Sequence, residues 1–290
     1  MALFELAVPN IYRLKIPFGG VWTGVFLVTG PENYLIDSGG NDQGVAEMIL
    51  PGLKELGYTV DDIAFLICTH THGDHVGGHH ALIEAGLNRI ACFEGSVDII
   101  RDPLKYNIAI RQVFPGYSAP PAKGLKGCEP NRLLKDGEVL GGYLRIVHTP
   151  GHDADACCIL DERTGTLITG DSLQWNGTDS QGIALVLDLP AYLESLDRLE
   201  ALAPQHILAG HPYEPDVCQV DGEAACRESL RLCRTYMDRY SAFIKARCEA
   251  GERDPAALAE ALIREMNVTR PGFLFLPMFT VTQHLKALGY

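Results

Sequence analysis

Short apolar runs separated by turn-forming residues dominate the first two-thirds of the chain. Runs such as residues 11–16 (IYRLKI) and 64–68 (AFLIC) have the length and composition of strands, and Gly, Pro, Asn and Asp lie between the runs. The pattern predicts strands at 11–16, 25–29, 34–36, 64–68, 89–93, 139–148, 156–160, 166–169 and 206–209, with helices near 42–56, 79–86 and 190–202. Strands interleaved with helices in this way are typical of a layered α/β fold.

Two segments break the pattern. Residues 94–136 contain five prolines and predict a helix near 97–113 followed by a proline-rich loop, so we interpret them as a lid-like insertion or pocket wall, with an exposed decoration as the alternative. Beyond His211 the apolar positions follow helical spacing, which predicts helices over 221–250, 254–266 and 278–288. We therefore expect a main domain over 1–215 and a helical C-terminal extension over 216–290.

Composition narrows the class of protein. The 290 residues are 47% apolar, which is typical of a globular protein, and 24 Lys and Arg against 37 Asp and Glu give a net charge of −13. This acidity disfavours non-specific nucleic-acid binding, which needs clustered positive charge. No apolar run approaches the roughly 18 residues of a membrane span, and the N-terminus lacks the pattern of a signal peptide. We therefore expect a cytoplasmic protein that does not enter a membrane.

The nine cysteines offer a first candidate for metal or redox chemistry. No two of them form a Cys-x-x-Cys pair, which argues against a thiolate zinc site and a thioredoxin-like motif. Cys226 and Cys233 lie seven residues apart on a predicted helix and share one face. We interpret most of the cysteines as reduced, small, buried side chains.

Four side chains that can bind a metal fall within six residues, directly after the predicted strand 64–68. In an extended chain His70 and His72 point to the same side, and Asp74 and His75 follow as the chain turns into the next helix. Packed together without a metal, these groups would compete for hydrogen-bond partners in a crowded loop. The pattern therefore predicts a metal site.

Three further candidates occupy comparable positions. His152, Asp171 and His211 each follow the end of a predicted strand and a glycine that lets the chain turn. The resulting seven ligands, five His and two Asp, are too many for one tetrahedral zinc but suit two ions that share a carboxylate. Such ligands suit two Zn²⁺, and also iron or manganese. With two carboxylates and a bridging hydroxide the centre would carry a charge of +1, which favours an oxyanion or an anionic substrate.

The order and spacing of these motifs resemble the metallo-β-lactamase-fold hydrolases. The resemblance covers about residues 11–215 and rests on Asp37, HTHGDH at 70–75, PGH at 150–152, GD at 170–171 and GH at 210–211. It implies an αββα sandwich with a dinuclear site at one edge of the two sheets. It also implies ligand roles: one metal held by His70, His72 and His152, the other held by Asp74, His75 and His211, with Asp171 bridging and Asp37 bracing the ligand loop.

Weaker matches resemble the branch that contains glyoxalase II and the β-lactamase-like-2 proteins, whose members carry a helical C-terminal part. They are YLESL at 192–196 with Leu199, and VTQHL at 281–285. One departure is Pro212, because many relatives have another glycine after the last His ligand.

Four aromatic residues are candidates for contact with a substrate. Phe18 and Trp22 belong to a glycine-rich hairpin loop that in this family often closes over substrate, although an ordinary hairpin has the same pattern. Trp175 follows Asp171, and Tyr213 follows His211 with surface packing as its alternative role.

The resulting prediction is a dinuclear metal-dependent hydrolase acting on a small-molecule ester, thioester or lactone. A metal-bridging hydroxide would attack the carbonyl, and Asp74 would orient it and accept its proton. The alternatives are a mononuclear iron oxidoreductase like the persulfide dioxygenases, a phosphodiesterase or nuclease of the same fold, and a non-catalytic binding protein. The substrate, the native metal and a homodimer stay open, because residues 17–23, 94–136 and the tail lie outside the shared motifs.

Overall fold

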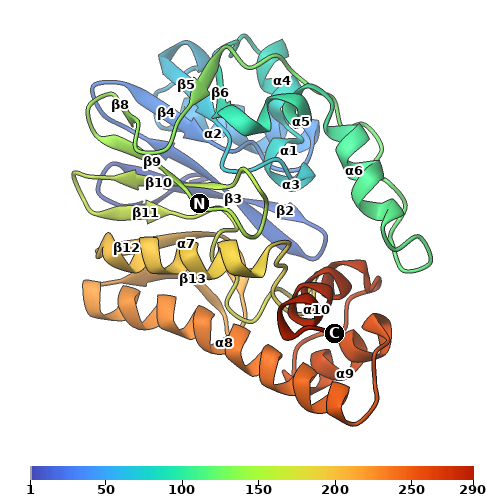
Figure 1. Cartoon of the computed structure of the whole chain (residues 1–290). Coiled ribbons are helices and arrows are strands. Elements are labelled where there is room, and N and C mark those ends of the chain that lie inside the picture. Colours follow the sequence, from blue (N-terminus) through green and yellow to red (C-terminus); the bar gives the residue numbers. More distant parts are fainter. Residues whose placement is uncertain (1) are drawn as a thin grey trace.

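Two β-sheets face each other at the centre of the computed structural model, and helices cover the outer face of each sheet (Figure 1). The structure describes residues 2–290. This arrangement is the αββα sandwich that the family resemblance implied.

The first sheet has the strand order β1-β2-β3-β4-β5-β6-β7. Its first four strands pair antiparallel, and the pairs from β4 to β7 are parallel. Their bounds are Glu5–Val8, Ile11–Phe18, Val21–Val28, Asn33–Ile36, Ile63–Ile67, Ile90–Phe93 and Arg132–Leu134. The parallel part brings the carboxyl ends of several strands to one edge, where a site can be assembled from their loops.

The second sheet has the order β13-β12-β11-β10-β9-β8. All its pairs are antiparallel except β11 with β12. In chain order from β8 to β13 the bounds are Val139–Leu140, Leu144–His148, Cys157–Asp161, Thr166–Ile168, His206–Tyr213 and Val217–Asp221.

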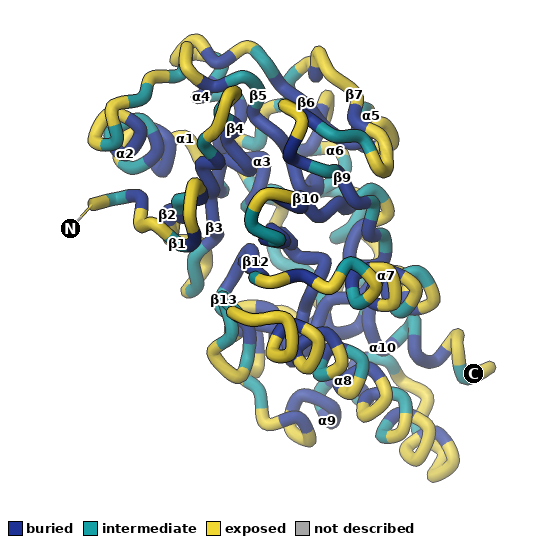
Figure 2. Tube along the Cα trace, turned by 90° about the vertical axis from the view of Figure 1, so that its left-hand side faces the viewer, coloured by how far each residue is buried: buried dark blue, intermediate teal, exposed yellow. Residues whose placement is uncertain are grey.

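Successive side chains of a strand point to opposite faces of its sheet, and in the central strands the side chains on both faces are apolar and buried. In β3, Phe26 and Val28 point between the sheets, whereas Val25 and Leu27 pack under the helices of the first layer. In β12, Leu208 likewise faces the other sheet, while its neighbours join the core under the second helical layer. Figure 2 shows the central strands largely buried, whereas edge strands such as β1 and β13 are partly exposed. Burial on both faces accounts for the nearly continuous apolar runs in the sequence.

The helices of the first layer follow the strands of the first sheet. They are α1 (Asp42–Gly44), η1 (Val45–Ile49), α2 (Leu50–Glu55), η2 (Val60–Asp62), α3 (Gly73–Val76) and α4 (His79–Glu84). After β6 come η3 (Glu94–Ser96), α5 (Val97–Arg101) and α6 (Pro103–Gln112). The helix predicted over 97–113 is therefore broken, because Asp102 leaves the helical conformation and caps α6 through Lys105 N. In Figure 1, α6 projects beyond the sheets.

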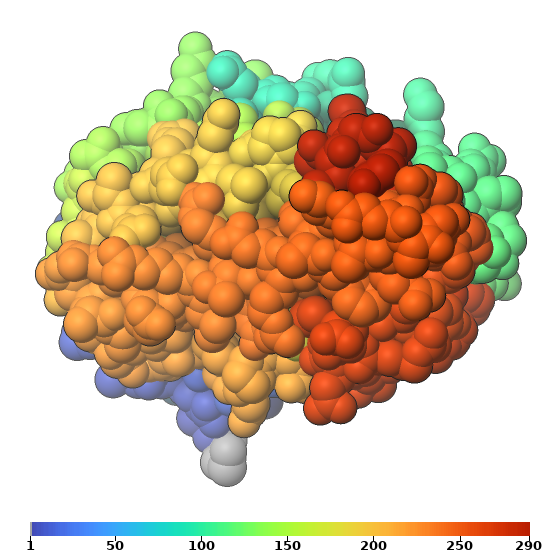
Figure 3. All heavy atoms as spheres, turned by 60° about the horizontal axis from the view of Figure 1, so that its bottom comes forward, coloured from blue at the N-terminus to red at the C-terminus, as the bar shows by residue number. Residues whose placement is uncertain are grey.

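The second helical layer consists of α7 (Leu189–Ala201), α8 (Glu223–Glu249), α9 (Pro255–Glu265) and α10 (Phe275–Leu288). One apolar cluster joins all four helices to the second sheet, with Leu199, Met237, Leu262 and Val281 packed into the same core as Ile207. Figure 3 shows the C-terminal helices covering most of the face in view. These helices therefore share a hydrophobic core with the sandwich.

The sequence pattern missed three strands, β1, β7 and β13. β7 ends the segment interpreted as an insertion, and β13 begins the segment predicted to be helical, so the helical part starts only at Glu223. All three lie at sheet edges and are short, and each carries an exposed polar residue that obscures the alternation of apolar and polar positions. The domain boundary at residue 215 stays a prediction, although it falls within the β12–β13 hairpin.

Two expectations about chemistry and membranes can be compared with the fold. All nine cysteines are free thiols, and Cys226 and Cys233 are both fully buried on one face of α8. Among residues 2–290, no helix combines the length and apolar character needed to cross a bilayer.

Candidate metal centre

All seven predicted ligands meet at one edge of the sandwich. His70 and His72 lie on the loop after β5, and Asp74 and His75 lie on α3, which begins directly after His72. His152 follows β9, Asp171 follows β11, and His211 lies near the end of β12. Residues from both sheets thus converge on one small volume, as the spacing predicted.

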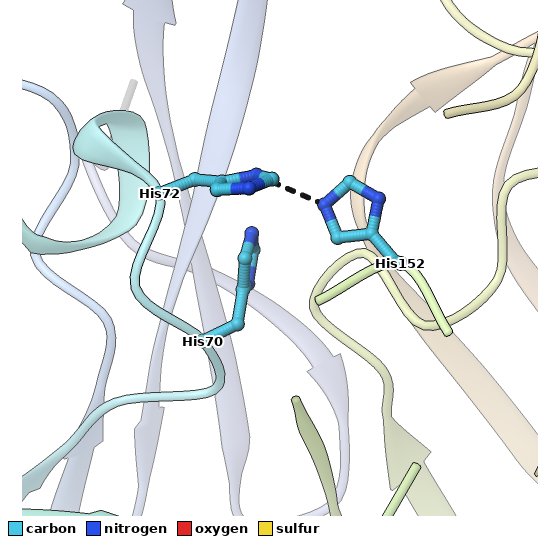
Figure 4. Close-up of side chains that lie close together, drawn as sticks. All are labelled: His70, His72 and His152. Carbon is cyan, nitrogen blue, oxygen red and sulfur yellow. Dashed lines mark hydrogen bonds between the residues drawn. The ribbon is translucent and has the colours of Figure 1, made fainter. Parts of the chain in front are cut away.

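Three histidines form the first group. His70, His72 and His152 point toward one another from two loops (Figure 4), and their ring centroids lie 4.6–4.9 Å apart. His72 Nδ1 lies 3.0 Å from His152 Nε2, the contact drawn as a dashed line. Their candidate ligand atoms all lie within 4.8 Å of one another.

The second group contains Asp74, His75 and His211. Asp74 Oδ2 lies 3.1 Å from His211 Nε2 and 3.7 Å from His75 Nε2. The two Nε2 atoms are 3.3 Å apart, and the three donor atoms again lie within 4.8 Å of one another. The geometry suits a second ion with mixed carboxylate and imidazole ligands.

Asp171 lies between the two groups. Its Oδ2 is 3.6 Å from His152 Nε2 in the first group and 3.3 Å from His211 Nε2 in the second, while its Oδ1 is 3.3 Å from His75 Nε2. One carboxylate therefore reaches both groups.

The donor set fits a pair of divalent metals. His70 Nε2 is a buried polar atom without a hydrogen-bond partner, and Asp171 Oδ1 has no hydrogen bond beyond its 3.3 Å contact with His75 Nε2. Such an arrangement costs free energy unless another group binds these atoms. Every candidate metal-binding group found among residues 2–290 is built from these seven side chains. Imidazole and carboxylate donors together suit zinc, iron or manganese.

Electrostatics differ between the two groups. Burial lowers the pKa of His70, and burial together with His72 lowers that of His152 to about 4, so these rings are neutral and offer lone pairs at pH 7. In the second group burial acts in the same direction, but the carboxylates of Asp171 and Asp74 outweigh it and raise the pKa of His211 to about 10. A metal binding there must compete with protons.

Three histidines are oriented through their second ring nitrogen. His75 Nδ1 donates to Asp37 Oδ2 (2.7 Å), His152 Nδ1 to Leu185 O (2.9 Å) and His211 Nδ1 to Trp22 O (2.8 Å). Each contact leaves Nε2 facing the centre, the arrangement usual for metal-binding histidines. Asp37 also accepts hydrogen bonds from the Thr69 amide (2.8 Å) and hydroxyl (2.7 Å), so it ties the ligand loop to α3.

The sequence patterns missed a second carboxylate brace, Asp153. Its Oδ2 accepts a hydrogen bond from Thr71 Oγ1 (2.8 Å), which joins the loop that carries His70 and His72 to the loop that carries His152. The available signal was its position directly after the predicted ligand His152.

A second missed feature is the segment behind His152. Thr280 Oγ1 on α10 donates to Ala184 O (2.7 Å) and accepts from Val186 N (2.9 Å), so it holds the backbone on both sides of Leu185. Tyr240 on α8 accepts a hydrogen bond from Ala184 N (3.3 Å). The C-terminal helices therefore fix the carbonyl that orients His152.

A cavity of about 200 Å³ opens beside the two groups. His72, Asp74, His152, Asp171 and His211 line it. The remaining wall is largely apolar and includes Phe18, Val21, Ile110, Leu125, Leu185, Phe275 and Leu276. Residues 94–136 and α10 therefore both contribute to the wall, and the interpretation of 94–136 as a lid-like insertion stays a prediction.

The four aromatic candidates lie in different places. Phe18 lines the cavity beside the ligands, whereas Trp22 and Tyr213 line a neighbouring pocket. Trp175 is fully buried under α8, where its Nε1 donates to Ser229 Oγ (2.8 Å), and it lines neither pocket. The structure thus places Trp175 in the core, although Thr178, Ser180 and Gln181 further along the same loop line the cavity.

Comparison with known proteins connects this geometry to a family. A family model for the metallo-beta-lactamase superfamily matches residues 18–211. The chain is similar to the lactamase-like protein aptB of Emericella nidulans, with 32% identity over 62% of this chain and 48% of the relative. An atrochrysone carboxyl ACP thioesterase of the same organism is 28% identical over 75% of this chain and 59% of its own length.

A beta-lactamase-like protein 2 homolog of Caenorhabditis elegans is 29% identical over 67% of this chain and 57% of its own length, which supports the predicted branch. The chain spans about half the length of the curated relatives it matches.

Solved structures show the same fold. A metallo-beta-lactamase family protein from Thermus thermophilus superposes with a TM-score of 0.73 at 23% identity, covering 97% of this chain and 95% of its own. A beta-lactamase domain protein from Burkholderia ambifaria gives a TM-score of 0.74 at 20% identity, covering 99% of this chain and 87% of its own. Since both superpositions cover nearly the whole chain, the C-terminal helices are part of the shared architecture.

Proposed function

The chain belongs to the metallo-beta-lactamase superfamily, and from this premise we propose that it is a dinuclear metal-dependent hydrolase of a small thioester, ester or lactone. The observation that carries the proposal is the pair of adjacent donor groups that share one carboxylate, Asp171. In the proposed arrangement His70, His72 and His152 hold one ion, and Asp74, His75 and His211 hold the other. Two zinc ions are the proposed occupants.

Two divalent ions bound there would supply an acidified water as nucleophile and an electrophile for the carbonyl oxygen. Asp74 would orient that water and accept its proton, a role supported by a side chain that is 18% exposed and lines the cavity. Burial raises the pKa of the Asp74 carboxyl, but the neighbouring His75 and His211 lower it by more, so the group is ionised at neutral pH.

A thioester is the favoured substrate. Two of the curated relatives, from Emericella nidulans and Passalora fulva, are named atrochrysone carboxyl ACP thioesterases, with 28% identity to this chain in each case. The largely apolar wall of the cavity fits a carbon-rich acyl group. Sequence identity of 28% supports a thioester as the bond that is cleaved, and it does not identify the acyl group.

The test is a panel of thioesters, lactones, β-lactams and phosphodiesters, measured on zinc-loaded wild type and on Asp74→Ala. We expect the highest kcat/KM on a thioester and loss of hydrolysis in the variant, with an unchanged circular dichroism spectrum. Hydrolysis of phosphodiesters alone, or oxygen uptake with glutathione persulfide in place of hydrolysis, would overturn the proposal. Full thioesterase activity in Asp74→Ala would refute the assigned role of Asp74.

A further inference from the structure

One side of the cavity is formed by α6, which contributes Tyr106, Asn107, Ile110 and Arg111. Tyr106 lies close to the metal centre, with its ring stacked on His72 at 6.2 Å between centroids. Arg111 is five residues further along the helix, an axial offset of about 7.5 Å. The helix therefore presents a cation to the cavity at a distance from the reacting centre.

The guanidinium of Arg111 has few partners. Its Nη1 donates to Asn107 O (2.9 Å), and its Nε is buried without a hydrogen bond. Its central carbon lies 5.4 Å from the ring centroid of Phe275. Within residues 2–290 no carboxylate forms an ion pair with it. Burial lowers the pKa of Arg111, because its charge is partly removed from water and no anion nearby compensates for it.

Among the cations of this chain, Arg111 is set apart by its place at the cavity, since Arg13 also has a buried Nε without a hydrogen bond but lines neither pocket. Arg101, Arg145, Arg198 and Arg234, for example, each pair with a carboxylate on the surface. Arg111 is the one Arg or Lys among the residues that line the cavity. The carboxylates in that lining, Asp74 and Asp171, belong to the proposed metal ligands and face the histidines.

We propose that Arg111 binds an anionic group of the substrate, so that the preferred substrate is an acyl thioester carrying a carboxylate or phosphate several bonds from the cleaved carbonyl. The inference rests on the proposed thioester hydrolysis and adds the substrate class. A guanidinium with free N–H groups in a largely apolar wall is suited to a carboxylate or phosphate, because charge-assisted hydrogen bonds are strong where water is excluded. Arg111 is then a specificity-determining residue.

Two pairs of substrates separate the two sources of the anion. The first pair is the pantetheine thioester of glutarate and its methyl ester, which differ in the charge at the acyl end. The second pair carries one neutral acyl group on 4′-phosphopantetheine and on pantetheine, which differ in the charge at the thiol end. Each is assayed with wild type, Arg111→Gln, Arg111→Lys and the control Lys105→Gln, which removes an exposed cation from the same helix outside the cavity.

We expect Arg111→Gln to lower kcat/KM for the charged member of one pair by about 10- to 100-fold, mainly through KM, and to change the neutral member by less than about twofold. Arg111→Lys should retain part of the preference, and Lys105→Gln all of it. Equal effects of Arg111→Gln on charged and neutral members of both pairs would overturn the proposal and indicate a packing role against Phe275.

A binding measurement separates this inference from the proposed function. Calorimetric titration with uncleavable thioether analogues of the same pairs reports recognition without turnover. Loss of affinity for the charged analogue in Arg111→Gln would support the anion site even if wild type cleaved no thioester. Equal affinities of wild type and Arg111→Gln for every analogue would overturn the inference even if thioesterase activity were found.

Discussion

Replacing Thr280 with valine removes a buried hydroxyl that links the C-terminal helices to the metal centre. Thr280 Oγ1 donates to Ala184 O and accepts from Val186 N, at 2.7 and 2.9 Å, and the residue is fully buried. Valine has nearly the same shape but cannot form either bond. The backbone on both sides of Leu185, whose carbonyl orients His152, then loses its support.

The expected magnitude follows from these contacts. Each buried backbone group left without a partner costs about 1–3 kcal/mol, so Thr280→Val should lower the free energy of unfolding by about 2–6 kcal/mol. Loss of the groups that orient a metal-binding histidine typically lowers metal affinity by about 10- to 100-fold. We expect both effects, although Thr280 contacts none of the proposed ligands.

Urea denaturation and chelator competition for zinc measure these effects on wild type, Thr280→Val and the matched variant Thr280→Ser. Serine keeps the hydroxyl, so its metal affinity should stay within about threefold of wild type, since it loses only a methyl group that does not contact the ligands. Wild-type zinc affinity in folded Thr280→Val would refute the role of α10 in orienting His152.

Two further perturbations test neighbouring parts of the structure. Asp37→Asn puts an amide where a carboxylate accepts hydrogen bonds from His75 and Thr69, so chelator competition should show about 10- to 100-fold weaker zinc binding; unchanged affinity would argue against the brace. Burial lowers the pKa of His284 from 6.5 to about 4, so its contribution to stability is complete above pH 6.5 and is lost as the pH falls toward 4. Urea denaturation at several pH values in this range measures the free energy of unfolding, which should fall by up to about 3 kcal/mol less in His284→Asn than in wild type. Equal decreases in the two proteins would contradict the lowered pKa of His284.

The side chains that meet at the candidate metal centre could be predicted because their signals are local. His70, His72, Asp74 and His75 lie within six residues, and His152, Asp171 and His211 each follow a glycine after or near the end of a strand. The strands that the sequence pattern missed, such as β7 and β13, are short edge strands whose pairing depends on a neighbour and not on their own composition.

Other roles depend on tertiary contacts that no local pattern records. Thr280 reaches Ala184 across 96 residues, and Arg111 becomes a cavity residue only because α6 lies beside the ligand loops. Trp175 shows the converse: its place after Asp171 suggested the cavity, yet its side chain packs into the core under α8. Sequence spacing therefore located the candidate metal centre better than the walls of the cavity beside it.

Stepwise return of zinc to chelator-treated protein, with thioester hydrolysis measured at each step, tests the dinuclear proposal most directly. With Asp171 shared between two donor groups, we predict that activity reaches its plateau at two zinc ions per chain. Full activity without metal, or a plateau at one ion per chain with no further binding, would contradict it.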